Sequence, residues 1–253
     1  MERTALPGRL SWQSGEVVAI RQETAHAKSL TLAVPQWSGH RAGQHVDIRL
    51  TAEDGYQAER SYSIASPPGV GQQIMLTVEL LNDGEVSPYL VEELRVGDKI
   101  ELRGPIGGYF VWEATMGGPL LLVAGGSGIV PLMAIVRHRN AVGSTVPTRL
   151  LVSARSYEEI IYRDELERLA ADNTGPEVIY TLTRSAPPTW TGYRRRIDAD
   201  LLKEVAWAAT GHPLAYICGP TEFVETAATD LLALGYEAAR IKTERFGATG
   251  GTG

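Results

Sequence analysis

The stretch ERSYSIASPP, residues 59–68, places an arginine, a tyrosine and serines in alternation. Along a β-strand successive side chains point to opposite faces, so Arg60 and Tyr62 share one face. Ser61 and Ser63 then share the other face. Arginine presents a planar fork of N–H donors that suits phosphate, and tyrosine offers a flat ring for stacking. An exposed strand face has the same composition, so phosphate binding and a solvated surface are both open.

A second set of candidate phosphate-binding groups begins at Gly84. Residues 86–94 are predicted to form a helix, with Ser87 as its N-cap and Pro88 at its first position. The free N–H groups and the positive end of such a helix attract phosphate oxygens. A planar ligand that carries phosphate would use the strand's arginine and tyrosine together with this helix start.

Glycines follow an apolar run in VAGGSGIVP, residues 123–131. Glycine lets the backbone approach a ligand closely, and the N–H groups at the start of the next helix favour a phosphate. A tight strand-to-helix turn also requires glycine. The spacing differs from the common G-x-G-x-x-G pattern, so a phosphate loop and a plain turn fit this segment equally well.

The single cysteine ends another apolar run, in YICGPTEF at residues 216–223. In an open α/β sheet, ligands bind at the carboxyl ends of the strands. Cys218 therefore either lines such a crevice or is a small buried apolar side chain, which is the usual fate of a lone cysteine. Taken alone, the sequence around Cys218 favours burial.

Composition limits the class of protein. The apolar fraction of 43% and the length of 253 residues allow two globular domains. The net charge of −6 argues against a general nucleic-acid binder. One cysteine cannot form an internal disulfide or hold a cysteine-ligated cluster, and the five histidines are scattered, so we expect no metal site. The chain shows no signal peptide or membrane span, which predicts a cytoplasmic protein without a membrane partner.

Two patterns of hydrophobicity divide the chain. Up to about residue 112, short alternating segments separated by Gly, Pro, Asn and Asp predict an antiparallel barrel or sandwich, and of the two we expect a six-stranded antiparallel β-barrel. From Gly117 onward, apolar strands alternate with helical segments, including one expected over residues 157–170, which predicts a doubly wound parallel sheet. We therefore expect domains at residues 1–114 and 115–253.

The order of four motifs identifies a family. R-x-Y-S at Arg60, G-x-x-S at Gly84, G-S-G-I-x-P at Gly126 and C-G-P at Cys218 together resemble the ferredoxin–NADP⁺ reductase superfamily. The resemblance extends over nearly the whole chain, from about Gly15 onward. It implies that the barrel binds FAD and that the second domain binds a nicotinamide dinucleotide.

The resemblance implies roles for the barrel residues. Arg60 is expected to bind the FAD pyrophosphate, Tyr62 to pack against the isoalloxazine, and Ser63 to hydrogen-bond near flavin N5. Ser61 is expected beside them in the cofactor site. Backbone or hydroxyl groups of the helix start are expected to contact the pyrophosphate; these belong to Gly84, Val86 and Ser87.

The resemblance also implies a nicotinamide site in the second domain. Its loop would be Gly126, Ser127 and Gly128, and the turn Cys218, Gly219 and Pro220 would lie beside the nicotinamide, with Cys218 as a catalytic packing residue. Thr183 and Arg184 stand where NADP-using relatives often place a Ser-Arg pair for the 2′-phosphate. This favours NADPH, with NADH still possible.

Other basic and C-terminal residues leave alternatives open. Arg155 and the run Arg194–Arg196 could support the same phosphate or form a solvated basic loop. Plant-type reductases end on a tyrosine over the flavin, whereas here Glu244 and Phe246 reach the end of the last strand. Phe246 could shield the flavin or be an ordinary core residue.

The resulting functional hypothesis is an FAD-dependent NAD(P)H oxidoreductase that takes a hydride from NADPH onto FAD. Electrons then pass to a separate acceptor such as a ferredoxin or oxygenase component, since one cysteine cannot ligate a 2Fe–2S cluster. The alternatives are a flavin or quinone reductase acting on diffusible substrates and a flavin-binding regulatory subunit. A monomer is expected.

Overall fold

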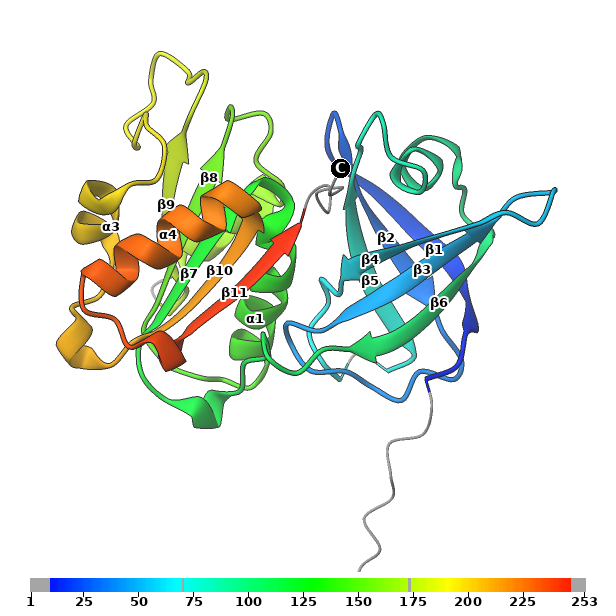
Figure 1. Cartoon of the computed structure of the whole chain (residues 1–253), viewed down its shortest axis with the longest axis horizontal. Helices are drawn as coiled ribbons and strands as arrows, with labels where there is room; N and C mark the ends of the chain where they lie inside the picture. The colour runs from blue at the N-terminus through cyan, green and yellow to red at the C-terminus, as the bar shows by residue number, and fades with distance from the viewer. Residues whose placement is uncertain (1–9, 70, 173, 247–253) are drawn as a thin grey trace, which may run out of the picture.

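The computed structural model describes residues 10–69, 71–172 and 174–246, and it consists of two β-sheets with different architectures (Figure 1). The six strands of the first sheet are β1 (Gln13–Thr24), β2 (Ala27–Ala33), β3 (His45–Thr51), β4 (Gln57–Ser63), β5 (Gln73–Glu79) and β6 (Lys99–Ile106). All of their pairings are antiparallel, in the order β4-β3-β6-β1-β2-β5. A bridge between Ile64 and Leu76 brings the two outer strands together, so the sheet curls into a barrel. The predicted six-stranded antiparallel barrel is confirmed.

Alternation along the strands fills the barrel with apolar side chains. Leu30, Leu32, Ile48, Ile74 and Leu102 are fully buried, and they form one cluster inside the barrel. The neighbours of these residues along each strand are polar or partly exposed. This period of two is the pattern expected for a sheet with one buried face.

The predicted helical segment over residues 86–94 forms over residues 87–93, but the predicted cap at Ser87 is wrong. A single π-helical turn forms over Tyr89–Glu93, preceded by Pro88, and no side chain caps it. The Ser87 hydroxyl instead accepts a hydrogen bond from the backbone N–H of Leu81 at 3.1 Å. Ser87 therefore closes the loop between β5 and the helical turn.

The second sheet is parallel and carries helices on both faces. Its strands are β7 (Leu120–Gly125), β8 (Thr148–Ala154), β9 (Glu177–Leu182), β10 (Leu214–Pro220) and β11 (Ile241–Phe246), in the order β11-β10-β7-β8-β9. Its helices are α1 (Ile129–Ala141), α2 (Arg163–Ala171), α3 (Ala199–Val205) and α4 (Thr221–Ala233). The doubly wound prediction is confirmed. In the described parts of the chain, no helix is long and apolar enough to cross a membrane.

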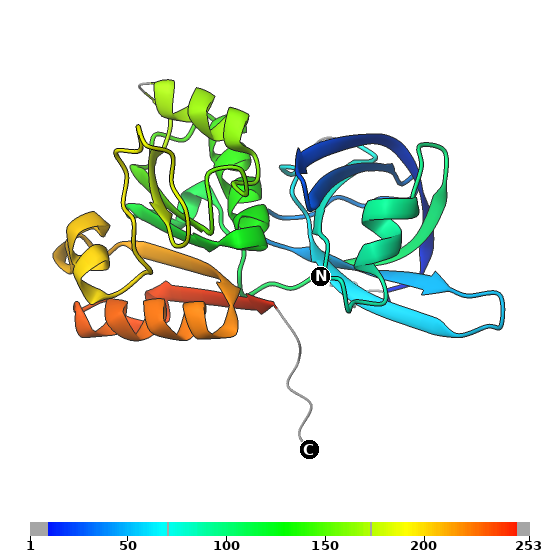
Figure 2. The same cartoon turned by 90° about the horizontal axis from the view of Figure 1, so that it is seen from above.

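The helices divide between the two faces of this sheet (Figures 1 and 2). Helices α3 and α4 pack against β7 and β10 through one cluster, which includes Leu121, Leu202 and Leu231. Helix α1 packs on the opposite face through a second cluster, which includes Leu122. That second cluster also contains Ala65 and other barrel-side residues, so α1 lies between the sheet and the barrel.

The helix expected over residues 157–170 begins later than the periodicity indicated. Tyr162 has a φ of +62°, a left-handed conformation that cannot be part of a right-handed helix, and α2 begins at Arg163. Tyr162 is nonetheless fully buried. Its apolar neighbours Ile160 and Ile161 are buried as a compact turn, which is why the sequence resembles an amphipathic helix there.

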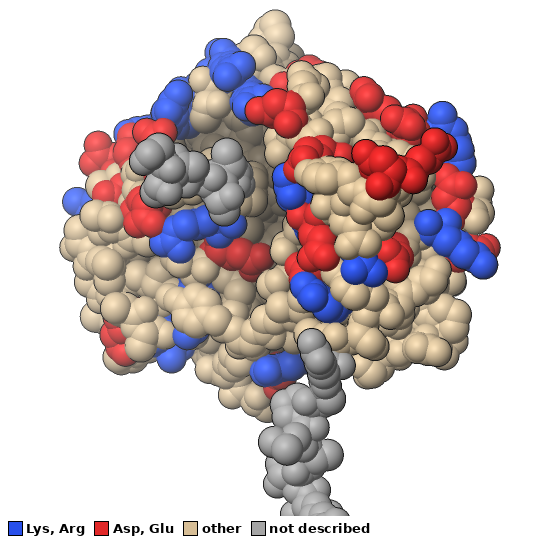
Figure 3. Space-filling view, turned by 45° about the vertical axis from the view of Figure 1, so that its right-hand side comes forward, with Lys and Arg blue, Asp and Glu red and all other residues tan. Residues whose placement is uncertain are grey.

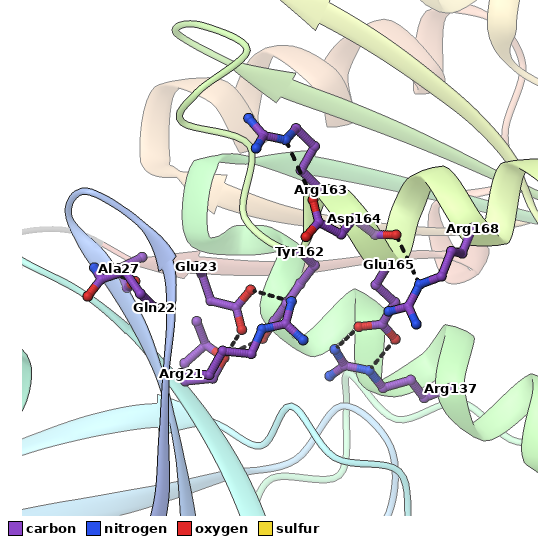
Figure 4. Close-up of polar contacts among 12 residues, drawn as sticks. Arg21, Gln22, Glu23, Ala27, Arg137, Tyr162, Arg163, Asp164, Glu165 and Arg168 are labelled. Carbon is purple, nitrogen blue, oxygen red and sulfur yellow. Dashed lines mark hydrogen bonds and ion pairs between the residues drawn. The ribbon is translucent and has the colours of Figure 1, made fainter.

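Polar contacts join the two halves beside α1 (Figure 4). Arg137 of α1 forms an ion pair with Glu165 of α2 at 2.5 Å and donates to the backbone carbonyl of Ala65 at 2.6 Å. The Tyr162 hydroxyl pairs with Thr77 of β5, and the Thr77 hydroxyl also pairs with Ser29 of β2. These contacts hold α1 and α2 against the barrel.

The two sheets are linked by residues 107–119. The predicted boundary between residues 114 and 115 falls in this segment and stays a prediction. Phe110, Val111 and Trp112 of the link are buried, and Val111 accepts a hydrogen bond from Tyr216 of β10 at 2.7 Å. The link is therefore packed against the parallel sheet.

Candidate functional site

A cavity of about 410 Å³ lies between the barrel and the parallel sheet, in the hollow visible in Figure 3. Both halves contribute to its wall. The barrel and the link supply Gly43, His45, Ser61, Ser63, Gly107, Gly108, Tyr109 and Phe110, and the second half supplies Ser127, Pro131, Cys218, Thr243, Glu244, Arg245 and Phe246. Four candidate residues from separate stretches of the sequence, Ser63, Ser127, Cys218 and Glu244, thus meet in one cavity.

The carboxyl ends of three adjacent parallel strands form the second half's wall. In the strand register, Cys218 of β10 lies opposite Ala124 of β7 and Glu244 of β11. The glycine loop follows β7 directly, as a 3₁₀ turn over Gly126–Gly128. Parallel strands present their carboxyl ends at one edge of a sheet, where ligands bind in open α/β folds.

Gly128 must be glycine because the loop packs directly on β10. A Cβ added at this position would lie 2.1 Å from the carbonyl oxygen of Cys218. Gly126 has a φ of +56°, a conformation that L side chains rarely adopt. The close packing of the loop on β10 is therefore enough to explain why residue 128 is glycine. The same packing places Ser127 at the cavity wall beside Cys218.

Strand β4 presents its two faces to two different environments. Ser61 and Ser63 line the cavity, and the Ser63 hydroxyl donates to Glu244 Oε1 at 3.4 Å. Ser61 donates to Asp47 of β3 at 2.7 Å. Tyr62 on the other face packs against the apolar interior of the barrel. The predicted division of the strand into two faces is thus what the structure shows.

Arg60 lies outside the cavity wall, near the loop between β5 and the π-helical turn. Its Nη2 forms an ion pair with Glu85 at 2.5 Å, and its Nη1 donates to the carbonyl of Glu59 at 2.7 Å. Gly84, Val86 and Ser87 flank Glu85 in that loop. Arg60 and the loop therefore come together, as the motif order predicted.

Burial shifts the pKa values of Glu244, Cys218 and His45 in the cavity, and it lowers that of His45. It raises the pKa of Glu244 to about 7, and the hydroxyl of Ser63 opposes this rise. Burial also raises the pKa of the Cys218 thiol well above its usual range, and the neighbouring Glu244 carboxylate raises it further. Cys218 is 2% exposed and stays a neutral thiol near pH 7. It is therefore suited to packing and unsuited to nucleophilic attack.

Phe246 lies at the cavity wall and is also packed against the core, and its shielding of a flavin stays a prediction. Its side chain lines the cavity and also packs, partly buried, against the cluster around α1. In the strand register Phe246 lies opposite Pro220, which ends β10. Gly219 approaches Phe223 of α4, so the Cys-Gly-Pro turn is held against the following helix.

Several cavity residues were missed by sequence reasoning. His45, Tyr109 and Phe110 belong to no motif, although His45 faces Ser63 directly in the pairing of β3 with β4. Hairpin register could have indicated His45, because residues 45–51 and 57–63 are joined by a short loop. Nothing in the sequence pattern points to Tyr109 or Phe110.

The candidate 2′-phosphate residues gather at the ends of β8 and β9. The backbone N–H of Thr183 donates to Ala154, and that of Arg184 donates to Arg155 at 2.9 Å. Arg155 and Arg184 have exposed side chains. Both therefore extend from the same edge of the sheet as the glycine loop.

The following basic run is divided by an ion pair. Arg195 pairs with Asp198, which is also the N-cap of α3. Arg194 and Arg196 remain exposed. Arg195 is therefore a structural residue of this loop, and the run offers two side chains for a ligand in place of three. Among the described residues, no three His, Cys, Asp or Glu side chains are grouped as a metal site would require.

The arrangement defines a class of protein, in which a barrel and a doubly wound sheet enclose a shared site. Two family models match the two halves. Residues 15–111 match the oxidoreductase FAD-binding domain, and residues 122–229 match the oxidoreductase NAD-binding domain.

Comparison with individual proteins agrees with this division. The chain is 32% identical to NADH-cytochrome b5 reductase 1 of Aspergillus terreus, over 78% of this chain and 68% of that protein. It is 30% identical to the phenol 2-monooxygenase reductase component DmpP of Pseudomonas sp. strain CF600, over 86% of this chain and 61% of that protein. The FAD/NAD-binding domain of nitric oxide dioxygenase from Vibrio cholerae superimposes with a TM-score of 0.82 at 25% identity, covering 92% of this chain and 98% of the domain.

The chain therefore belongs to the ferredoxin–NADP⁺ reductase superfamily, and it is a flavoprotein oxidoreductase that uses NAD(P)H.

The raised pKa of Glu244 predicts a specific dependence of stability on pH. The folded protein holds this proton up to about pH 7, whereas the unfolded chain releases it near the usual value of 4.5. The folded state therefore binds more protons between these values, and its stability falls as pH rises through them. Glu244→Gln removes this contribution. The free energy of unfolding of the variant minus that of wild type should therefore rise by up to about 3 kcal/mol from pH 5 to pH 8, as measured by urea unfolding.

Glu53 supplies the control, since Glu53→Gln removes a carboxylate from an exposed position. Its stability difference from wild type should stay constant between the two pH values. If the stability difference between Glu244→Gln and wild type were also constant between the two pH values, the folded protein would not hold a proton at Glu244.

Proposed function

We propose that this chain binds FAD between Arg60 and the cavity, accepts electrons from NADPH, and passes them to a separate redox protein. The observation that carries the proposal is the meeting of Ser63, Cys218 and Glu244, from opposite halves, in one cavity. Bound FAD would supply the redox chemistry, because it can accept a pair of electrons and release them singly or together. The protein would contribute position, electrostatics and exclusion of water.

The barrel residues fit a flavin that carries a diphosphate. The Arg60 fork and the loop at Gly84–Ser87 lie next to each other and would hold the pyrophosphate. The flavin ring would extend from there toward the cavity, with Tyr62 against it and Ser61 and Ser63 beside its edge. The Ser63 hydroxyl donates to Glu244, so this pair could hold or move a proton at Glu244 Oε1 next to the ring.

The second half fits the nicotinamide. Gly126–Gly128 would cradle the dinucleotide, and Cys218–Pro220 would pack beside the nicotinamide ring, with Phe246 closing the cavity. The neutral Cys218 thiol would position the ring by contact, since burial keeps it protonated. Ser127 and Cys218 already share the wall at which the two rings would meet.

NADPH is the proposed coenzyme because cationic side chains stand where its extra phosphate would lie. Arg155 and Arg184 extend from the ends of β8 and β9, and Thr183 directly follows β9 and donates its backbone N–H to Ala154. A site for NADH typically offers a carboxylate to the ribose 2′-hydroxyl. The cytochrome b5 reductase relative is named for NADH, so the coenzyme must be measured directly.

A separate electron acceptor is proposed from the kind of protein to which the chain is similar. The phenol monooxygenase relative is named as a reductase component, which implies a partner in that system. We expect cytochrome c reduction by this chain and NADPH to depend on an added ferredoxin. Rapid, ferredoxin-independent reduction of free flavin or quinone would favour the alternative, a reductase acting on diffusible substrates.

The proposed role of Arg60 predicts the loss of flavin from a folded protein. Arg60→Ala should retain its circular dichroism spectrum but lose most of its FAD on purification. A hydrogen bond to a charged group contributes about 1.5–3 kcal/mol, which corresponds to a roughly 10- to 100-fold weaker affinity. The measurement is the ratio of flavin absorbance to protein.

Arg41→Ala is the matched control, because Arg41 is another half-exposed arginine of the barrel half and is paired with Glu113. Its flavin content should equal that of wild type. Full flavin retention by Arg60→Ala would remove the basis for placing the pyrophosphate there.

The proposed coenzyme predicts a selective effect of Arg184→Ala. Wild type should have the higher kcat/KM with NADPH. The variant should lose about tenfold or more with NADPH and little with NADH, because the lost interaction is with the 2′-phosphate. Arg168→Ala on α2 should leave both values unchanged. A wild-type preference for NADH would show that the NADPH assignment is mistaken.

A further inference from the structure

The guanidinium of Arg60 is held by an internal carboxylate. Glu85 Oε2 accepts from Arg60 Nη2 at 2.5 Å, and Glu85 Oε1 accepts from the Tyr56 hydroxyl at 2.6 Å. Both oxygens of Glu85 are therefore used, one by the arginine and one by the tyrosine. These three residues come from the loop before β4, from β4 itself and from the loop after β5.

Glu85 lies at the centre of the proposed pyrophosphate site. It stands between Gly84 and Val86, in the loop whose N–H groups would face the diphosphate, and its side chain reaches Arg60 on β4. The carboxylate therefore links the two sets of phosphate donors. A carboxylate and a phosphate oxygen accept from the same guanidinium N–H groups, so both cannot be bound there in full.

We propose that Glu85 is an intramolecular competitor for the flavin phosphate, and that Tyr56 holds it against Arg60. This inference rests on the proposed function, because it requires Arg60 to bind the FAD diphosphate. FAD binding would then displace Glu85 from Arg60, and release of FAD would return it. Glu85 would thereby lower the affinity for phosphorylated flavins and make FAD exchangeable.

The charges of the three residues favour this role. Hydrogen bonding from Tyr56 and then from Arg60 lowers the pKa of Glu85, so its carboxylate is charged throughout the neutral range. About half of the Arg60 side chain and nearly half of that of Glu85 are exposed, at 51% and 45%, so the pair can open without disturbing the core.

The pair's exposure sets the expected size of the effect. Exposed ion pairs contribute modestly, which predicts an affinity change of about two- to fivefold when the competition is removed. Flavins without phosphate have no group for Arg60 to bind. Their affinity should be unaffected by Glu85.

The test is titration of the full-length, deflavinated protein with FAD, FMN and riboflavin, followed by flavin fluorescence. Glu85→Gln keeps the shape of the side chain and removes its charge. It should bind FAD and FMN about two- to fivefold more tightly than wild type, with riboflavin unchanged. Asp83→Asn is the matched control, since it removes one charge from the same loop without belonging to the Arg60 contact. The FAD affinity of this control should equal that of wild type within the error of replicate titrations.

Tyr56→Phe provides an independent variant. It leaves the Glu85 charge in place but removes the hydroxyl that holds it, so it should tighten FAD binding in the same direction and by less. Unchanged or weaker FAD binding in both Glu85→Gln and Tyr56→Phe would overturn the proposal. Weaker FAD binding in Glu85→Gln alone would indicate that Glu85 binds the flavin, and this result would also overturn the proposal.

Arg60→Ala separates failure of this inference from failure of the proposed function. If Arg60→Ala binds FAD more weakly and Glu85→Gln does not bind it more tightly, Arg60 binds the diphosphate but Glu85 does not compete with it. If Arg60→Ala binds FAD as well as wild type, the diphosphate site itself is wrong. In the Arg60→Ala background, Glu85→Gln should no longer discriminate between FAD and riboflavin.

Discussion

The packing of helix α1 between the parallel sheet and the barrel is the constraint on which the rest of the structure depends. Residues 129–136 of α1 are buried on every side, so the helix cannot face solvent and must be enclosed. At its C-terminal end Arg137 reaches the carbonyl of Ala65 and the carboxylate of Glu165. Because the cavity takes its walls from both halves, their relative orientation decides whether Ser63 and Glu244 meet at all.

The close approach of the glycine loop to β10 determines how the second wall is built. Gly128 lies against the carbonyl of Cys218, and no side chain fits between them. This contact brings the ends of two central strands together and leaves the Cys218 thiol and Ser127 at the cavity surface. A single requirement for glycine therefore serves both the turn and the placement of the proposed nicotinamide site.

Charge is distributed differently at the two ends of the proposed flavin site. In the cavity, burial favours the neutral forms of Cys218 and Glu244, which suits contact with uncharged rings. On the outer side of β4, Arg60 and Glu85 are both ionised and half-exposed. Buried groups thus stay neutral where the proposed ring chemistry takes place, and the contacts are ionic and exposed where the proposed phosphates bind. An open ionic contact is easily exchanged, which is the property that a displaceable carboxylate requires.

The sequence by itself determined the two architectures, because alternation with a period of two and continuous apolar strands followed by helices are local patterns. It also determined the division of β4, since Ser61 and Ser63 must oppose Arg60 and Tyr62 in any strand. The start of α2 at Arg163 was decided by tertiary contacts, which bury Tyr162 in a left-handed conformation. The missing cap at Ser87 results from a contact within its own loop, which directs Ser87 to Leu81. Likewise, the pairing of Glu85 with Arg60 and the meeting of Ser63 with Glu244 join residues 25 and 181 positions apart. The first contact depends on how the barrel closes and the second on how the two halves pack, and no local pattern specifies either.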